Sequence, residues 1–321
     1  MQGLSELGTR SGGVWTRAQA LAAASPGTVR AALRCGAWEL LWPGVYADAG
    51  YPATPARDAW AAVLASSGTT SGAAVACGRT AARWWGLPLV DDHDPASGTA
   101  ERGTDEVAVS GHRSVLRWGD RRLVRRRLRL EPDDVVQAPD GLLFTSIART
   151  LVDCAVRLDE AAAVCAVDAA LHRGLVGEPE LRAAVLARRG TPGAAALARV
   201  VERADGRAES PLETLVRLLL VPVLPTLEPQ VRVRDADDRV LARVDLGDRT
   251  RRLAVEADGV RAHAGPWMVA RDRQRDAVLA SAGWHTERIT WFEVRRRPQE
   301  TSRRVLRRAE LLDREAGAVT R

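Results

Sequence analysis

The sequence contains no lysine, and all 47 of its basic residues are arginine. This absence excludes mechanisms that need a lysine amine, including Schiff-base enzymes and nucleotide hydrolases with a GxxxxGK[ST] phosphate loop. A coding bias toward Ala, Arg, Gly and Val, as in a GC-rich genome, accounts for arginine in place of lysine. The basic excess still has a physical consequence, because the formal charge is +6 and the isoelectric point is near 10.0. It favours polyanionic partners, since guanidinium groups bind phosphate oxygens well.

Cysteines are few, and long apolar runs are missing. The four cysteines are scattered without a CxxC pair, so neither a zinc site nor a disulfide framework is expected. No stretch approaches the roughly 18 uncharged apolar residues that a membrane span requires. The first thirteen residues, MQGLSELGTRSGG, have no apolar signal core. We therefore expect a cytoplasmic protein with no membrane partner.

Three segments follow one another along the 321 residues, a length that predicts two or three domains. The two prolines of YPATP close the first segment, and the second is rich in Ala and Arg. Most of the alternation typical of strands is in the third. The expected domains are residues 1–53, 54–207 and 208–312, followed by a polar tail that frays. The expected fold class is α+β, with an α/β middle domain.

The first segment predicts two short helices and a β-hairpin. Residues 14–20 predict the start of one helix with Thr16 as its N-cap, and residues 28–35 predict a second helix. The alternating run Trp38–Trp42 and residues 45–47 flank a Pro-Gly turn, which predicts a hairpin. This order is typical of a winged helix-turn-helix, whose second helix enters the major groove of DNA.

The second helix of this segment would offer Thr28, Arg30 and Arg34 to DNA. The alternative is a helical cap that packs on the rest of the protein and binds nothing. The run at residues 36–46 has the pattern Gly-x-Trp-x-x-Leu-x-Pro-Gly-Val-Tyr. Together with GVWTRAQA and SPGTVRAAL before it, this run resembles the N-terminal winged-helix domain of abortive-infection type IV antitoxins. The resemblance implies binding of double-stranded DNA, with a cognate toxin protein as a candidate partner.

The middle segment carries a concentration of arginine, eight in the nineteen residues 112–130. Two interpretations stay open: a solvated pair of strands with alternating arginines, or a stripe that contacts phosphates. Helices are predicted at residues 78–87, 145–156 and 160–172. The second of these resembles the helical part of the same antitoxin family. The segment is expected to be a scaffold or a partner-binding domain.

The third segment predicts a helix followed by strands. Ser210 is a suitable N-cap, Pro211 suits the first helical position, and Glu213 completes a capping box. Capping is thus the alternative to any chemical role for Glu213. Strands are predicted at residues 230–234, 240–246 and 252–257. A further helix begins at Arg271, and a last strand holds Trp284, Ile289 and Trp291 as core residues.

Alternation places two carboxylates of this segment. If Val244 and Leu246 face the core, Asp245 faces away from it. By the same reasoning Glu256 faces away from the core in the next strand. Two acids on one face of neighbouring strands are costly unless a cation joins them, and Mg²⁺ or Mn²⁺ accepts oxygen ligands of this kind. The register stays open, because a tight turn separates the two carboxylates and a longer loop brings them together.

Several spaced signals of the third segment resemble the DUF559 group of the PD-(D/E)XK nuclease superfamily, which is related to very-short-patch mismatch repair endonucleases. These signals are Glu213, Asp245, Glu256-Ala257-Asp258-Gly259, His263, Asp272 with Arg275 and Leu279, Gly283-Trp284, and Arg288. The resemblance covers most of residues 208–309. It implies a restriction-endonuclease-like αβββαβ core that cleaves DNA with a divalent metal.

The resemblance also implies roles for individual residues. Asp245 would be the central metal ligand, Glu256 the second ligand, and Glu213 a residue that binds or orients metal and water. Asp258 stands where the superfamily normally has a lysine. His263 would act as general base or phosphate contact, the alternative being a surface histidine at a helix end.

Two arginines of the third segment are candidate DNA contacts. Arg275 lies three residues after Asp272, so it either contacts phosphate or pairs with that acid. Arg288 lies on the opposite face of its strand from Ile289, so it is expected to point at the acidic cluster.

The sequence supports two alternative functions. The first is a metal-dependent DNA endonuclease that performs phosphodiester hydrolysis and carries a winged-helix DNA reader. The second is an antitoxin-like DNA-binding transcriptional regulator whose nuclease fold is catalytically inactive. An RNA substrate and a purely structural role are the remaining alternatives.

Overall fold

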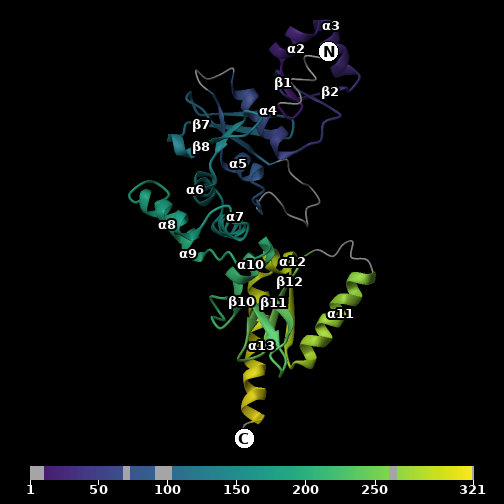
Figure 1. The fold of residues 1–321 in the computed structure, drawn as a ribbon, viewed down its shortest axis with the longest axis vertical. Helices are drawn as coiled ribbons and strands as arrows, with labels where there is room; N and C mark the ends of the chain where they lie inside the picture. The colour runs from purple at the N-terminus through teal and green to yellow at the C-terminus, as the bar shows by residue number, and fades with distance from the viewer. Residues whose placement is uncertain (1–10, 68–72, 91–102, 260–265, 320–321) are drawn as a thin grey trace. The chain divides into compact units, whose positions relative to one another are not determined.

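The computed structural model describes residues 11–67, 73–90, 103–259 and 266–319, with the side chains of residues 266–272 and 319 left aside. The fold is a mixed α+β one (Figure 1). The chain divides into two compact units. The first contains residues 1–166 and 176–199, and the second contains Val167–Leu175 and Val200–Arg321.

The first unit begins with two helices and a three-stranded sheet. Its elements are β1 (Val14–Thr16), α2 (Arg17–Ala23), α3 (Pro26–Arg34), β2 (Trp38–Trp42) and β3 (Val45–Asp48). The strands lie in the order β1-β3-β2, all antiparallel. Trp15, Ala20, Val29 and Tyr46 form a small core between the helices and the sheet. The predicted order of helix, turn, helix and hairpin is thus present.

A six-stranded sheet in the order β6-β7-β5-β4-β9-β8 forms the rest of the first unit. Its strands are β4 (Val75–Ala76), β5 (Asp105–Ala108), β6 (Ser114–Trp118), β7 (Arg121–Arg126), β8 (Val135–Gln137) and β9 (Leu143–Thr145). The helices of this region are α4 (Pro55–Ser67), α5 (Gly78–Trp84), η1 (Pro132–Asp134), α6 (Ile147–Arg157), α7 (Glu160–His172), α8 (Glu178–Ala187) and α9 (Ala194–Arg203). Helices α7 and α9 cross the division between the units.

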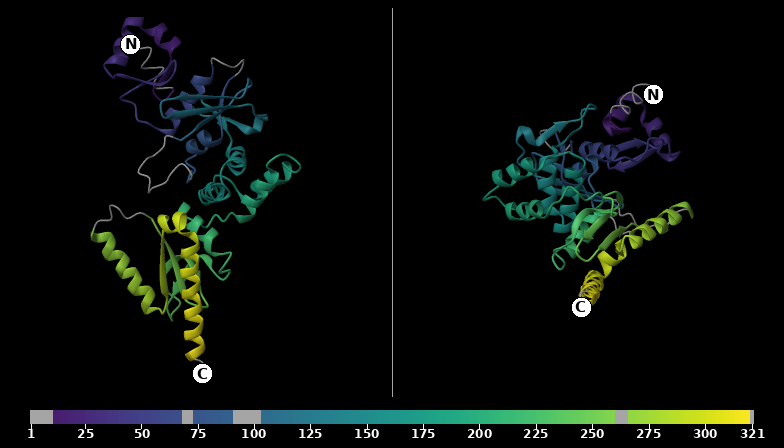
Figure 2. Two further views of the ribbon diagram at one scale, coloured as in Figure 1. Left: turned by 180° about the vertical axis from the view of Figure 1, so that it is seen from behind. Right: turned by 60° about the horizontal axis from the view of Figure 1, so that its bottom comes forward.

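The second unit has one mixed sheet in the order β10-β11-β12-β13. Its elements are α10 (Pro211–Leu220), β10 (Glu228–Arg234), β11 (Val240–Asp248), β12 (Leu253–Asp258), α11 (Pro266–Ser281), β13 (His285–Thr290), α12 (Trp291–Arg296) and α13 (Pro298–Val319). Leu279 of α11 packs with Val244 and Ala254 on one face of the sheet. Helices α10, α12 and α13 pack against one another away from α11 (Figure 2).

Several element boundaries differ from the sequence-based predictions, and four of these differences change the type or the extent of an element. Residues 14–16 form a strand, and the helix starts only after Thr16, whose side chain caps it. Helix α11 begins at Pro266, before Arg271. Trp291 starts helix α12 and is no part of a strand, since Thr290 caps that helix. The tail does not fray at residue 312, because α13 continues to Val319.

The start of helix α10 depends on a buried ion pair in the second unit. Asp168, only 1% exposed, accepts hydrogen bonds from Thr214 (2.8 Å), Arg217 (2.8 Å) and the amide of Asp205 (2.7 Å). These bonds fix the end of α7 to the first turns of α10, the helix that carries Glu213. No helix in the described ranges is long and apolar enough to cross a membrane.

We predict that Asp168→Ala lowers the free energy of unfolding of the second unit by about 3 kcal/mol, because it leaves the Arg217 guanidinium buried without its counterion. Urea denaturation followed by circular dichroism measures the loss. Arg182→Ala is the control, since it breaks an exposed ion pair with Glu178 and should change stability by less than about 1 kcal/mol. Equal stability of the two variants would contradict the assignment.

Candidate functional site

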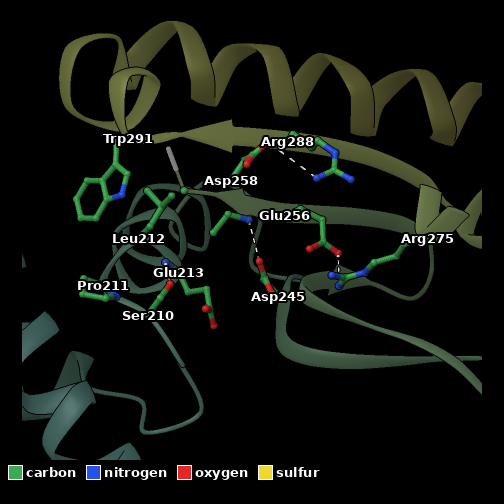
Figure 3. Close-up of a pocket in the computed structure, with 12 residues that line it drawn as sticks. Ser210, Pro211, Leu212, Glu213, Asp245, Glu256, Asp258, Arg275, Arg288 and Trp291 are labelled. Carbon is green, nitrogen blue, oxygen red and sulfur yellow. Dashed lines mark hydrogen bonds and ion pairs between the residues drawn. The ribbon is translucent and has the colours of Figure 1, made fainter. Parts of the chain in front are cut away.

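One cleft of the second unit collects most of the residues singled out by the sequence. Its volume is about 460 Å³. It is lined by the N-terminal turn of α10, by Asp245 of β11, by the end of β12, by Arg275 of α11 and by Arg288 of β13 (Figure 3). Four carboxylates line it together: Glu213, Asp245, Glu256 and Asp258. The N-terminus of α10 also faces the cleft, and its partial positive charge favours acids there.

Strands β11 and β12 part at this cleft. Their ladder runs from the Asp248–Leu253 pair to the Leu246–Val255 pair and ends there. Asp245 and Glu256 occupy the next two opposite positions, just beyond the last pair. The connecting loop, residues 249–252, is therefore of the longer kind that brings the two carboxylates together. This geometry settles the register that the sequence left open.

The side chain of Asp245 replaces a backbone acceptor at the point where the strands part. Its Oδ2 accepts a hydrogen bond of 2.8 Å from the amide of Ala257, which has moved out of reach of the β11 backbone. Burial raises the pKa of Asp245, while the Ala257 hydrogen bond and the Arg275 guanidinium act in the opposite direction. The Oδ1 atom accepts no hydrogen bond from the described residues and is available to a cation.

Glu256 is almost completely buried, at 6% exposure. Burial, followed by the charge of Asp245, raises its pKa to about 8. Its Oε1 accepts a hydrogen bond of 2.9 Å from Arg275 Nη2, and the same guanidinium donates to the carbonyl of Arg243. A carboxylate that is both buried and close to another acid needs a positive partner to stay ionised. Arg275 lowers the pKa of Glu256 but does not offset burial and the charge of Asp245, so the carboxyl keeps its proton up to about pH 8.

The sequence analysis expected Glu256 to face away from the core. This expectation was wrong, because hydrophobic residues pack on the same face of β12 as Glu256. Ala254, two residues before Glu256, packs with Val244 against Leu279 of α11. Helix α11 covers this side of the sheet, and other helices cover the opposite side. Glu256 thus lies at the end of a covered face, which is why it is buried.

Glu213 lies in the first turn of helix α10, and Ser210 is the N-cap as predicted. In the predicted capping box, the Glu213 side chain would accept a hydrogen bond from the amide of Ser210. It accepts one from the amide of Glu209 instead, at 2.9 Å. Burial raises the pKa of Glu213, and the nearby Asp245 contributes. Glu213 therefore combines a capping role with a place in the cleft.

Gln230 is a site residue that the sequence analysis missed. Its Nε2 donates to Glu213 Oε2 at 2.8 Å, and its Oε1 is buried without a partner among the described residues. Its φ of 56° is unusual for a residue with a side chain. The alternating run 230–234 shows only a strand, so no sequence pattern identifies this conformation.

The two candidate arginines of this unit both line the cleft. Arg275 pairs with Glu256, and the alternative partner Asp272 has no described side chain. Arg288 Nη2 binds Asp276 at 2.6 Å, and its Nη1 lies 3.9 Å from Asp258. Arg288 thus points toward the acids, as expected from its strand position. His263 lies outside the described residues.

A divalent cation fits the chemistry of this cleft as a ligand of two carboxylates. In the described part of the chain, no three His, Cys, Asp or Glu side chains are arranged to hold an ion together. Asp245 and Glu256 form an adjacent pair at the parting of the strands. Mg²⁺ commonly uses one or two carboxylates and completes its shell with water and phosphate oxygens. Glu213 as a third ligand stays a prediction.

The residues predicted to contact DNA in the first unit lie on α3. Thr28, Arg30 and Arg34 are all exposed. Thr28 is also part of the N-terminal cap, since its amide donates to Ser25 Oγ at 3.1 Å and the two hydroxyls lie 3.0 Å apart. The arginines are therefore the more available contacts on this helix.

Comparison with known proteins gives limited matches. Two uncharacterized proteins from two strains of Mycobacterium tuberculosis are each 34% identical to this chain over 175 residues. The match covers 54% of this chain and 64% of each relative, so the chain spans less than two thirds of these curated relatives. No family profile matches the chain, and no solved structure matches it significantly.

We predict that Glu256→Gln changes how stability depends on pH. Between pH 4.5 and about 8 the folded protein keeps a proton on Glu256 that the unfolded chain has released. The free energy of unfolding therefore falls as the pH rises through this range. The variant lacks this loss and should be more stable than wild type by about 1–2 kcal/mol at pH 8, with a smaller difference at pH 5.

Thermal unfolding at both pH values measures this difference. Glu310→Gln is a matched control, because Glu310 is exposed on α13. Parallel pH profiles of wild type and the Glu256 variant would show that the buried carboxylate does not take up a proton on folding.

Proposed function

We propose that this protein is a metal-dependent DNA endonuclease that hydrolyses phosphodiester bonds at the carboxylate cleft. The observation that carries the proposal is the pairing of Asp245 and Glu256 at opposite positions, just beyond the last ladder pair of β11 and β12. The order α10-β10-β11-β12-α11-β13 also matches the αβββαβ core implied by the resemblance to the DUF559 group. The first two segments would then be a winged-helix DNA reader and an antitoxin-like middle domain.

Asp245 and Glu256 would hold Mg²⁺ or Mn²⁺ through the oxygens that face the cleft. When bound, such a cation polarises the scissile phosphate and lowers the pKa of a water. Glu213, which accepts a hydrogen bond of 2.8 Å from Gln230, would accept a proton from a water on the α10 side of the cleft. Arg288 and Asp258 lie on the β13 side, where the guanidinium supports the charge of a phosphate.

Arg275 would have to release Glu256 for a cation to take its place. Its side chain is 40% exposed, so it can turn toward solvent or toward a phosphate at little cost. The arginine thus serves as a counterion of the acid without metal and as a phosphate contact with metal. In a chain without lysine, arginine is the side chain that carries a permanent positive charge for this task.

We predict that purified protein nicks supercoiled plasmid in Mg²⁺ or Mn²⁺ and that Asp245→Asn lowers the rate roughly 100-fold or more. Asparagine keeps an oxygen for the Ala257 amide, so the fold should persist, and a melting curve checks this. Asp237→Asn, in the exposed β10–β11 turn, is the control and should cut at the wild-type rate. An inert wild type, or equal cutting by Asp245→Asn, would reject the endonuclease.

A second candidate is an antitoxin-like DNA-binding regulator whose cleft is inactive. It is favoured by the cleft arginines, because Arg275 and Arg288 already form hydrogen bonds with Glu256 and Asp276. It is also favoured by the lack, among the described residues, of three side chains that hold an ion together. In this case α3 carries the function, and a cognate toxin protein is a candidate partner.

For this regulator we predict sequence-preferring binding to DNA from upstream of its own gene, without a metal requirement. Arg30→Ala/Arg34→Ala should weaken binding in a gel-shift assay by tenfold or more, since each base or phosphate contact contributes about 1–3 kcal/mol. Arg182→Ala/Arg189→Ala removes the same charge from another exposed part of the first unit. If both double variants bind as wild type does, α3 is not the reading helix.

A further inference from the structure

The β6–β7 hairpin and its flanks contain the concentration of arginine noted in the sequence. Residues 112–130 hold eight arginines and a single acid, Asp120. Strand β6 is at the edge of the six-stranded sheet and pairs only with β7 among the described strands. The structure separates these arginines into two groups with different surroundings.

Three arginines have partners in neighbouring elements and hold the hairpin in place, and a fourth forms an exposed ion pair after it. Arg121 pairs with Asp58 of α4 at 3.2 Å, and Arg125 donates to the carbonyl of Ala65 at 2.7 Å. Arg126 pairs with buried Glu106 of β5. Arg129 pairs with Glu131 at 3.0 Å. A structural role therefore explains the first three, whereas the Arg129–Glu131 pair is exposed and contributes little to stability.

The other four arginines are exposed, and no described residue forms an ion pair or hydrogen bond with any of them. They are Arg113, Arg117, Arg122 and Arg127. Arg117 and Arg122 are direct partners in the antiparallel register of β6 and β7. Their side chains therefore leave the sheet on the same face, with Cβ atoms about 5 Å apart.

This arrangement opposes folding. Like charges directly opposite each other on two strands destabilise the pair. No acid of the described chain forms an ion pair with either arginine. Val115 on the same face is 47% exposed, whereas Val124 opposite it is buried, so the face is covered at Val124 and open around Arg117 and Arg122. A repulsion of this kind is relieved when an anion bridges the two guanidinium groups.

We propose that the Arg117–Arg122 face of this hairpin binds the phosphate backbone of duplex DNA without reading its sequence. The charge pattern favours DNA over an acidic protein. The cores of protein interfaces are depleted of charge, whereas DNA interfaces are strongly positive throughout. The inference goes beyond the proposed cleavage site, because it adds a backbone contact in the middle segment and does not require cleavage.

The test measures how DNA affinity depends on salt. Full-length protein is titrated into a fluorescent duplex in EDTA, and anisotropy is recorded at several salt concentrations. Each lost phosphate contact lowers the slope of log K against log salt by about one. Arg117→Ala/Arg122→Ala should therefore lower the slope by about two, equally for unrelated sequences. Arg129→Ala/Arg182→Ala removes two exposed, ion-paired arginines and should leave the slope unchanged.

A melting curve separates binding from folding. Removing a repulsive pair should leave the melting temperature of Arg117→Ala/Arg122→Ala at or above that of wild type. A marked fall would mean that the two arginines support the fold, and this would overturn the proposal. An unchanged slope, with binding to polyglutamate lost instead, would also overturn it and assign the face to an acidic protein.

The outcome is independent of the endonuclease proposal. If Arg117→Ala/Arg122→Ala lowers the slope by about two but the wild type never nicks plasmid, the endonuclease is rejected and the hairpin contact is supported. A protein that nicks plasmid while Arg117→Ala/Arg122→Ala keeps the full slope would reject the hairpin contact alone.

Discussion

The hydrogen bond from the Ala257 amide to the Asp245 carboxylate is the contact on which the candidate site depends. It supplies an acceptor where the β11 backbone has turned away from β12. Without such an acceptor the strands would either keep pairing and close the cleft or leave a buried amide unsatisfied, which costs roughly 1–3 kcal/mol. A carboxylate at this position thus has a structural reason to be there, and its second oxygen is left to the cleft.

Burial and charge then act against each other around this contact. Four carboxylates line one cleft, and burial raises the pKa of three of them, Glu213, Asp245 and Glu256. Arg275, Arg288 and the N-terminus of α10 provide the compensating positive charge. Either a cation or an arginine can supply the positive charge next to Glu256. For this reason the cleft is compatible with both proposed functions.

Local patterns in the sequence predicted most of the elements, and tertiary contacts account for what they missed. The Ser210-Pro211 pair identified the start of α10, and residues 160–172 were predicted with the bounds of α7. Alternation has a period of two and indicates faces, but it contains no information on which residues of two strands lie opposite. The conformation of Gln230 and the cover of α11 over Glu256 depend on distant contacts, and no local pattern contains them.

The contribution of Asp168 to the second unit has a consequence for the modularity of the gene. The nine residues Val167–Leu175 belong to a unit whose remaining chain begins at Val200, and residues 176–199 return to the first unit. A single cut in the chain therefore cannot separate the two units cleanly. During synthesis, this short segment leaves the ribosome well before its packing partners and has to wait for them. Recombination that exchanges the last third of the chain would succeed only with a segment 167–175 that fits the incoming partner.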